Sequence, residues 1–260
     1  MFAAERHRKI GELVAAKNRA TVGELADRFD ITKETVRRDL ATLEQQGVLR
    51  RVHGGAVAAG RASTSEQSLG SRQLQRHEEK QRIARKALEL IPSGPASLVI
   101  DAGTTTEQLA DLLAAESNGQ HEDLLVITHA VPIAFRISTG SKLQLEMIGG
   151  RVRGLTSAGI GARTLEQFAA LRPDIAFIGA NGIDAGFCLS TPDALEAAVK
   201  TAIVRCARRV VALVDSSKLE EETLVRFAGL EEIDTLITDA APPAALAEAL
   251  EAADVEVVVA

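Results

Sequence analysis

The sequence predicts a two-part protein: a small α+β winged helix-turn-helix head, followed by a larger α/β domain built on an open, mostly parallel sheet. Residues 21–45 carry an apolar period of three to four, which is typical of amphipathic helices, and a short basic stretch follows them. From about residue 97 onward, short apolar runs alternate with helical stretches, as strands and helices do in a parallel sheet. Residues 58–76 are small and polar, without an apolar period. We therefore expect the head at 1–57, a linker at 58–76 and the α/β domain at 77–260.

The head is expected to begin with a helix at residues 4–17 and to hold the helix-turn-helix at about 20–39. Thr21 lies three residues before Glu24, a capping-box pattern that starts the first of the two helices. Thr32 is a favourable N-cap for the second. Along that second helix three apolar residues recur at helical spacing and predict one buried face: Val36, Leu40 and Leu43.

The side of the second helix that this apolar stripe leaves free carries basic residues. Recognition helices read base edges mainly with their first turn, so we expect DNA contacts from Thr32, Lys33, Glu34, Thr35, Arg37 and Arg38. Gly47 is expected to end the helix. The extended basic stretch after it resembles a β-wing on a phosphate backbone, with contacts expected from Arg50, Arg51 and His53. The alternative is an ordinary solvated helix face, but a second basic patch directly after the helix favours DNA.

Formal charge is unevenly distributed along the 260 residues. Residues 1–60 hold 11 basic and 8 acidic side chains, whereas the remainder holds 19 and 28. A basic head on an acidic body suits local binding of duplex DNA better than non-specific coating. Trp and Tyr are absent, so stacking on single-stranded nucleic acid is not expected.

Cysteine usage and hydropathy indicate the cellular compartment. The two cysteines, Cys188 and Cys206, form neither a disulfide framework nor the spacing of a zinc site, which fits a reduced cytosol. The first residues are too charged for a signal peptide, and no apolar run reaches the roughly 18 residues that a membrane helix needs. We expect a cytoplasmic protein without a metal, a cofactor or a membrane partner.

Seven apolar runs are expected to form the strands of the α/β domain, at residues 97–100, 124–128, 143–148, 175–178, 210–214, 235–237 and 255–259. Helices are expected around them, at residues 77–91, 106–115, 131–138, 163–170, 193–206 and 243–252. In an open, Rossmann-like sheet of this kind, ligands bind beyond the carboxyl ends of the strands.

The segments that follow four of these strands carry residues suited to a phosphorylated sugar. The first opens a helix with a glycine and three hydroxyls, an oxyanion cradle assisted by the helix dipole: Asp101, Gly103, Thr104, Thr105 and Thr106. The other segments add groups that bind hydroxyls and one cation: Thr128, Asn181, Asp184 and Lys218. The alternative is that such residues serve turns and helix caps alone. Gly149-Gly150-Arg151 also follows a strand, and it either binds an anion or forms a turn at a domain or dimer contact.

Six motifs in one order resemble the DeoR family of bacterial transcriptional regulators: TVRRDL, LEQQGVLRRVHGGAV, DAGTTT, IGGRVR, FIGANGID and VDSSK. The resemblance runs from about residue 5 to 239. It implies that the α/β domain is similar to the ribose-5-phosphate isomerase fold and senses a phosphorylated sugar or related metabolite. The family commonly has Thr-Asn where this chain has Thr128-His129, which leaves the role of position 129 open.

Glu196 and Lys200 lie four residues apart on one expected helix. They form either a surface ion pair or part of the effector rim. The second interpretation follows from the resemblance, because the related isomerases use acidic and lysine residues in their pocket.

The leading interpretation is a DNA-binding regulator: a repressor of a carbohydrate-metabolism operon, controlled by a phosphorylated sugar. Its expected partners are a double-stranded operator, the effector and further copies of the chain, as a dimer or tetramer. The rival is a sugar-phosphate isomerase or deaminase with an accessory DNA-binding head, which would need a general base and an electrophile from Glu196, Asp184 and Lys200. A constitutive architectural DNA protein is disfavoured by the acidic body. Under the leading interpretation no residue is catalytic.

Overall fold

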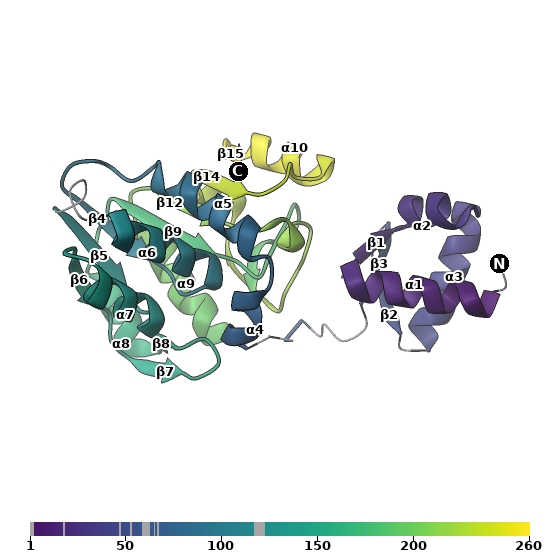
Figure 1. The fold of residues 1–260 in the computed structure, drawn as a ribbon, viewed down its shortest axis with the longest axis horizontal. Coiled ribbons are helices and arrows are strands. Elements are labelled where there is room, and N and C mark those ends of the chain that lie inside the picture. Colours follow the sequence, from purple (N-terminus) through teal and green to yellow (C-terminus); the bar gives the residue numbers. More distant parts are fainter. Residues whose placement is uncertain are drawn as a thin grey trace. The chain divides into compact units, whose positions relative to one another are not determined.

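The computed structural model describes residues 3–17, 19–46, 48–52, 54–58, 63–64, 66, 68–116 and 123–260. The chain divides into two compact units, Met1–Ser65 and Glu66–Ala260, which we call the head and the body (Figure 1). Within the described ranges, no helix is long and apolar enough to cross a lipid bilayer.

The head combines helices with a small antiparallel sheet of strand order β1-β3-β2. Its elements in chain order are α1 (Ala3–Lys17), β1 (Arg19–Thr21), α2 (Val22–Phe29), α3 (Lys33–Gln45), β2 (Leu49–Val52) and β3 (Gly55–Ala58). Strands β2 and β3 form the predicted wing. Gly55 lies so close to β1 that a Cβ would meet the carbonyl oxygen of Ala20 at 2.3 Å, so only glycine fits there.

Both predicted helix starts are confirmed. The Thr21 hydroxyl accepts the backbone N–H of Glu24 at 3.1 Å, and the Glu24 carboxylate accepts the backbone N–H of Thr21 at 2.8 Å. The Thr32 hydroxyl accepts the backbone N–H of Thr35 at 3.2 Å. These bonds satisfy N–H groups that the start of a helix otherwise leaves unpaired.

The head has an apolar core of its own. The three residues of the predicted stripe, Val36, Leu40 and Leu43, are at most 2% exposed. They cluster with apolar residues of α1, α2 and the sheet: Ile10, Val14, Leu25, Leu49 and Ala56. Burial of this stripe orients α3 so that its opposite face meets solvent.

Seven parallel strands form the main sheet of the body, in the order β15-β14-β12-β9-β4-β5-β6. They are β4 (Ala96–Ile100), β5 (Leu124–Thr128), β6 (Gln144–Met147), β9 (Ile175–Gly179), β12 (Val210–Leu213), β14 (Thr235–Thr238) and β15 (Glu256–Val259). All seven predicted strands are confirmed, with small shifts at their ends. The chain leaves β4 toward one edge and later returns to β9 on its other side, so the order of strands reverses between β4 and β9. Such a reversal is where open α/β sheets bind ligands.

Helices cover both faces of this sheet (Figure 1). One apolar cluster joins it to α5 (His77–Leu88), α6 (Thr104–Glu116) and α7 (Val131–Gly140). The other joins it to α8 (Ala162–Ala169), α9 (Ala194–Cys206) and α10 (Ala244–Ala252). Neighbouring residues of a strand face opposite clusters, as Leu98 and Val99 do in β4.

The expected linker at 58–76 differs from the structure. Residues Leu69–Leu74 form helix α4, which Ser68 caps by accepting the backbone N–H of Ser71, and they belong to the body. The prediction is therefore wrong for the second half of this range. Helix α4 buries none of its residues, so it carries no apolar period that could reveal it in the sequence.

Several short elements were not predicted. Strands β7 (Arg151–Arg153) and β8 (Ala158–Ile160) form a hairpin, so the segment after Gly150 is a strand rather than only a turn. Strands β10 (Gly182–Asp184), β11 (Cys188–Thr191) and β13 (Val225–Ala228) form a small antiparallel sheet. Two 3-10 turns complete the body, η1 (Ser216–Lys218) and η2 (Leu230–Glu232).

Candidate DNA interface and effector pocket

The free face of α3 carries the predicted DNA-contacting side chains. Among them Thr32, Lys33, Glu34, Arg37 and Arg38 are exposed, and Thr35 is half-buried. The Arg37 guanidinium lies 3.2 Å from the Glu34 carboxylate, an exposed pair that costs little to break. On the wing Arg51 is exposed in β2. The side chain of Arg50, and the predictions for Gly47 and His53, lie outside the described residues.

An ion cluster that sequence reasoning missed holds α3 against α1. Asp39 is 4% exposed, and its carboxylate accepts hydrogen bonds from Arg6 at 2.6 and 3.1 Å. The same carboxylate lies 2.9 Å from Nε2 of His7. Burial alone would raise the pKa of Asp39, but its hydrogen bonds to Arg6 and His7 hold the pKa below its usual value. The periodicity of α3 places Asp39 beside Val36 and Leu40, which was the available signal.

In the body, one pocket gathers most of the residues predicted to bind an effector. From the predicted set it is lined by Gly103, Thr104, Thr105, Thr106, Asn181, Glu196, Lys200 and Lys218. They come from the amino end of α6, the segment after β9, helix α9 and turn η1. The pocket therefore lies at the carboxyl ends of β4 and β9, where the strand order reverses.

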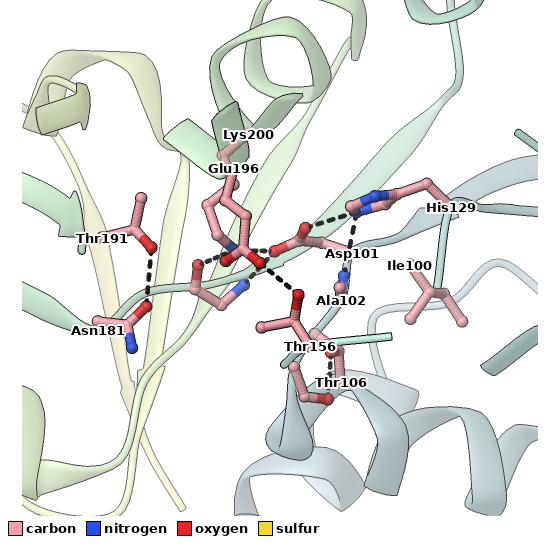
Figure 2. A network of polar contacts seen from close by, with 12 residues as sticks. Ile100, Asp101, Ala102, Thr106, His129, Thr156, Asn181, Thr191, Glu196 and Lys200 are labelled. Atoms are coloured by element: carbon pink, nitrogen blue, oxygen red, sulfur yellow. Dashed lines mark hydrogen bonds and ion pairs between the residues drawn. The ribbon is translucent and has the colours of Figure 1, made fainter. Parts of the chain in front are cut away.

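Beneath the pocket, Asp101 is a buried hub (Figure 2). Its carboxylate pairs with the Lys200 ammonium, which also donates to the carbonyl oxygen of Gly179 at 2.9 Å. The Asp101 carboxylate also accepts the backbone N–H of Gly179 at 3.1 Å. Nε2 of His129 lies 3.1 Å from the other carboxylate oxygen, and Nδ1 lies 2.8 Å from the carbonyl oxygen of Gly159. His129 thus fixes Asp101, which is a structural role for position 129.

The charge state of Asp101 follows from these contacts. Burial would raise the pKa of Asp101, but the nearby Lys200 and His129 lower it to about 2. The carboxylate is therefore charged at neutral pH and fixes the Lys200 ammonium at the pocket floor.

At the amino end of α6, two hydroxyls remain available to a ligand. The Thr106 hydroxyl donates to the carbonyl oxygen of Gly103 at 2.8 Å, so it serves the helix start. Thr104 and Thr105 are each 8% exposed, and their hydroxyls make no hydrogen bond to another described residue. Backbone N–H groups in the same first turn and the helix dipole favour an anion here.

Three basic residues that the sequence analysis assigned to the linker or left aside also line the pocket: Arg72, Arg76 and Lys80. The Lys80 ammonium donates to the carbonyl oxygens of Arg72 and Gln75 at 2.5 and 2.8 Å, which leaves one N–H for the pocket. Burial lowers the pKa of Lys80 to about 8. The Nε of Arg72 is buried and has no hydrogen-bond partner among the described residues.

Arg76 differs from its two basic neighbours because carboxylates already neutralise it. Its guanidinium lies 3.2 Å from Asp215 and 2.8 Å from Asp239. The spacing of these three basic residues, four apart from 72 to 80, was a signal in the sequence.

Three residues of the predicted effector set do not line the pocket: Asp101, which lies beneath it, and Thr128 and Asp184. The Thr128 hydroxyl donates to the carbonyl oxygen of Ile100 at 2.7 Å and accepts the N–H of Ala130, so it is used within the sheet. The Asp184 carboxylate accepts the backbone N–H groups of residues 186 and 187 and closes the turn between β10 and β11. Local backbone groups satisfy both side chains, and we withdraw both from the site.

The surface ion pair between Glu196 and Lys200, the alternative to a role at the effector rim, is not formed. Lys200 pairs with Asp101, and the Glu196 carboxylate accepts a hydrogen bond from the Thr156 hydroxyl (Figure 2). The same carboxylate also accepts a hydrogen bond from Arg153 at 3.1 Å. Asn181 accepts the Thr191 hydroxyl at 3.0 Å, which orients its amide in the pocket. In the described part of the chain, no cluster of His, Cys, Asp and Glu is arranged to hold a metal ion.

Comparison with known proteins identifies both units. Residues 6–62 match the DeoR-like helix-turn-helix domain, and residues 75–240 match the DeoR C-terminal sensor domain. The HTH-type transcriptional regulator GlpR of Haloferax volcanii is 35% identical over 99% of this chain and 98% of its own length. The glycerol-3-phosphate regulon repressor of Escherichia coli K12 is 33% identical over 96% of each chain.

Among solved structures, ribose 5-phosphate isomerase A of Methanocaldococcus jannaschii aligns with 55% of this chain and 54% of its own, with 18% identity and a TM-score of 0.41. Together, the two matched domains and the full-length relatives establish that this chain belongs to the DeoR family and is a DNA-binding transcriptional regulator, not an enzyme.

Proposed function

We propose that this protein represses genes of carbohydrate metabolism and that a phosphorylated sugar or polyol bound in the body controls its affinity for the operator. The main support is the pocket itself, where free hydroxyls, a helix amino end and cations meet at the strand-order reversal. The name of the Escherichia coli relative, a glycerol-3-phosphate regulon repressor, supports the same ligand class.

The residues that line the pocket fall into two chemical groups. Thr104, Thr105 and the cations of Lys80 and Arg72 suit a phosphate dianion. Asn181, Glu196 and Thr156 offer amide, carboxylate and hydroxyl oxygens that suit ligand hydroxyls. The ligand class is therefore a phosphate monoester that carries at least one hydroxyl.

In the head, α3 is expected to enter the major groove. Its exposed Lys33, Arg37 and Arg38 would contact bases or phosphates, and Arg50, Arg51 and His53 of the wing would contact the backbone or the minor groove. Two heads in a homo-oligomer, a dimer or tetramer, would engage paired half-sites. The effector would act as a switch only if it binds the DNA-competent and incompetent states with different affinity, typically by about 1–3 kcal/mol.

The effector assignment is tested with Thr105→Val, which keeps the side-chain shape and removes the free hydroxyl. The wild type is first titrated with glycerol 3-phosphate, a panel of sugar phosphates and unphosphorylated glycerol. Thermal shift measures ligand binding. DNA fragments that the protein selects from a random pool are used to measure how each compound changes DNA affinity. We expect only phosphorylated compounds to bind, and Thr105→Val to weaken binding by about 1 kcal/mol or more, because a bond to a charged group is lost. DNA affinity without effector should stay unchanged.

The control for this experiment is Thr139→Val on α7, whose hydroxyl donates to the carbonyl oxygen of Phe135 and lies outside the pocket-lining residues. A Thr105→Val protein that responds to the effector like the wild type and the control would reject the pocket as the sensing site.

The DNA-contact assignment is tested with Arg37→Ala and Arg38→Ala. Each change should lower operator affinity at least tenfold, about 1.4 kcal/mol, and reduce the salt dependence of binding where a phosphate contact is lost. Effector affinity and thermal stability should not change. Arg8→Ala is the matched control, because Arg8 lies on α1 in an exposed pair with Glu12. Equal operator affinity for all three variants in fluorescence anisotropy would rule out the proposed orientation of α3.

A further inference from the structure

A single carboxylate lies between two arginines at the start of the body. Glu66 is the first residue of this unit, and its side chain is 3% exposed. One carboxylate oxygen lies 2.8 Å from Nη1 of Arg153, and the other lies 3.8 Å from Nη2 of Arg72. Neither oxygen has a hydrogen bond of good geometry within the described part of the chain. Glu66 is thus held by charge attraction rather than by directional bonds.

Both arginines also connect to the pocket. Arg72 lines it directly and keeps a buried Nε without a hydrogen-bond partner among the described residues. Arg153 shares its Nη1 between Glu66 and the pocket-lining Glu196, at 2.8 and 3.1 Å. Glu196 in turn accepts the hydroxyl of Thr156, which also lines the pocket. The two cations that hold Glu66 are therefore within reach of whatever binds there.

We infer that Glu66 competes with the effector for Arg72 and Arg153, so that effector binding releases the Glu66 carboxylate at the point where the chain leaves the body toward the head. This inference rests on the proposed function and adds how the signal leaves the pocket. A phosphate offers Arg72 two parallel hydrogen bonds, which a carboxylate at 3.8 Å does not. A ligand hydroxyl at Glu196 rearranges the carboxylate that shares Arg153.

A buried carboxylate that loses its cations cannot stay buried at low cost. The charged form of Glu66 is already disfavoured, because burial and the neighbouring Glu196 raise its pKa. Arg153 opposes this rise. Glu66 therefore moves to water when its partners turn to the ligand.

Linkage gives this competition a definite sign. If the ligand and Glu66 exclude each other, removing the charge of Glu66 must tighten ligand binding, whichever state binds DNA. A residue with only a structural role would have the opposite effect, because its loss would loosen the pocket. Glu66→Gln keeps the side-chain shape and removes the charge, so it separates the two cases.

The experiment compares full-length wild type and Glu66→Gln by calorimetric titration with glycerol 3-phosphate and with inorganic phosphate. We expect the variant to bind the phosphorylated ligand about fivefold more tightly or better, and the ligand to change its DNA affinity less than it changes that of the wild type. Glu89→Gln is the matched control, since Glu89 forms an exposed pair with Lys86 on the surface of α5. It should behave as the wild type.

A second measurement uses the wild type alone and does not depend on the folding of the variant. A glutamate-specific protease should cleave after Glu66 faster when ligand is present, whereas cleavage after the exposed Glu89 should not change. Unchanged cleavage at Glu66, or equal or weaker ligand affinity of Glu66→Gln, would overturn the competition while leaving the pocket intact. A wild type that binds no phosphorylated compound would overturn the proposed function and this inference together.

Discussion

The ammonium of Lys80 shows how one buried side chain can serve both structure and ligand binding. Two of its N–H groups bond carbonyl oxygens at the end of α4, and the third is available in the pocket. Burial brings the pKa of Lys80 down to about 8. A phosphate dianion beside it would favour the charged form and raise this pKa again. Ligand binding and protonation of Lys80 are therefore coupled.

This coupling predicts that effector affinity falls as the pH rises above about 8, where free Lys80 loses its proton. The decrease should approach about tenfold per pH unit at most, the limit for one linked proton. Phosphate monoesters are already dianions above pH 7, since their second pKa is about 6, so the ligand does not contribute. Calorimetry in buffers of different ionisation enthalpy would detect the proton that is taken up. Lys80→Arg keeps its charge throughout, and its affinity should stay flat between pH 7 and 9.

At the scale of one element, helix α3 depends on a charge cluster as well as on its apolar stripe. Val36, Leu40 and Leu43 bury one face, and Asp39 extends that face with bonds to Arg6 and His7 of α1. The stripe sets which side of α3 is hidden, and Asp39 sets how α3 lies along α1. The exposed arginines of α3 can contact a DNA groove only if both the apolar stripe and the Asp39 contacts keep the helix in this orientation.

Asp39→Asn should therefore destabilise the head by about 1–3 kcal/mol, because the hydrogen bonds of Arg6 to a charged partner are lost. In the wild type the pKa of Asp39 is lower in the folded state than its unfolded value near 3.8. The contribution of Asp39 to stability is therefore complete above pH 3.8 and is lost as the pH falls below this value toward the folded pKa. Urea unfolding at pH 7 and pH 3 measures both effects. Asp27→Asn on the exposed side of α2 is the control. Equal losses for the two variants, or a loss that grows at low pH, would contradict this account.

At the scale of the whole molecule, the two units have separate apolar cores. The head cluster contains residues of the first unit only, and the two clusters of the body contain residues of the second only. The free energy of unfolding of each unit is therefore expected to depend on its own core.

Separate cores predict two transitions in scanning calorimetry. A ligand at 100 times its dissociation constant should stabilise the unit that binds it by about 2.7 kcal/mol. A phosphorylated effector should thus raise the transition of the body, and operator DNA that of the head. Leu40→Ala should lower the transition temperature of the head alone, because it reduces the free energy of unfolding of that unit by about 2–5 kcal/mol. One cooperative transition that shifts equally with every ligand and variant would show that the units unfold together.

The sequence determined the elements whose signals are local. The caps at Thr21 and Thr32 act over three residues. The five inner strands of the parallel sheet are mostly buried and read as continuous apolar runs, which is why they were found. The edge strands β6 and β15 are mostly exposed, and their apolar residues were still enough to predict them. Short strands such as β7 and the small helix α4 escaped, because neither buries enough apolar surface to leave a pattern.

The tertiary structure alone decided which polar residues share the pocket. Thr128 and Asp184 have suitable chemistry but are used by nearby backbone groups, whereas Arg72 and Lys80 reach the pocket from a segment expected to be a linker. The partners of Asp101, Glu196 and Glu66 come from distant parts of the chain. Periodicity and capping are short-range effects along the chain. The choice of charge partner depends on which segments meet after folding, and no local pattern records it.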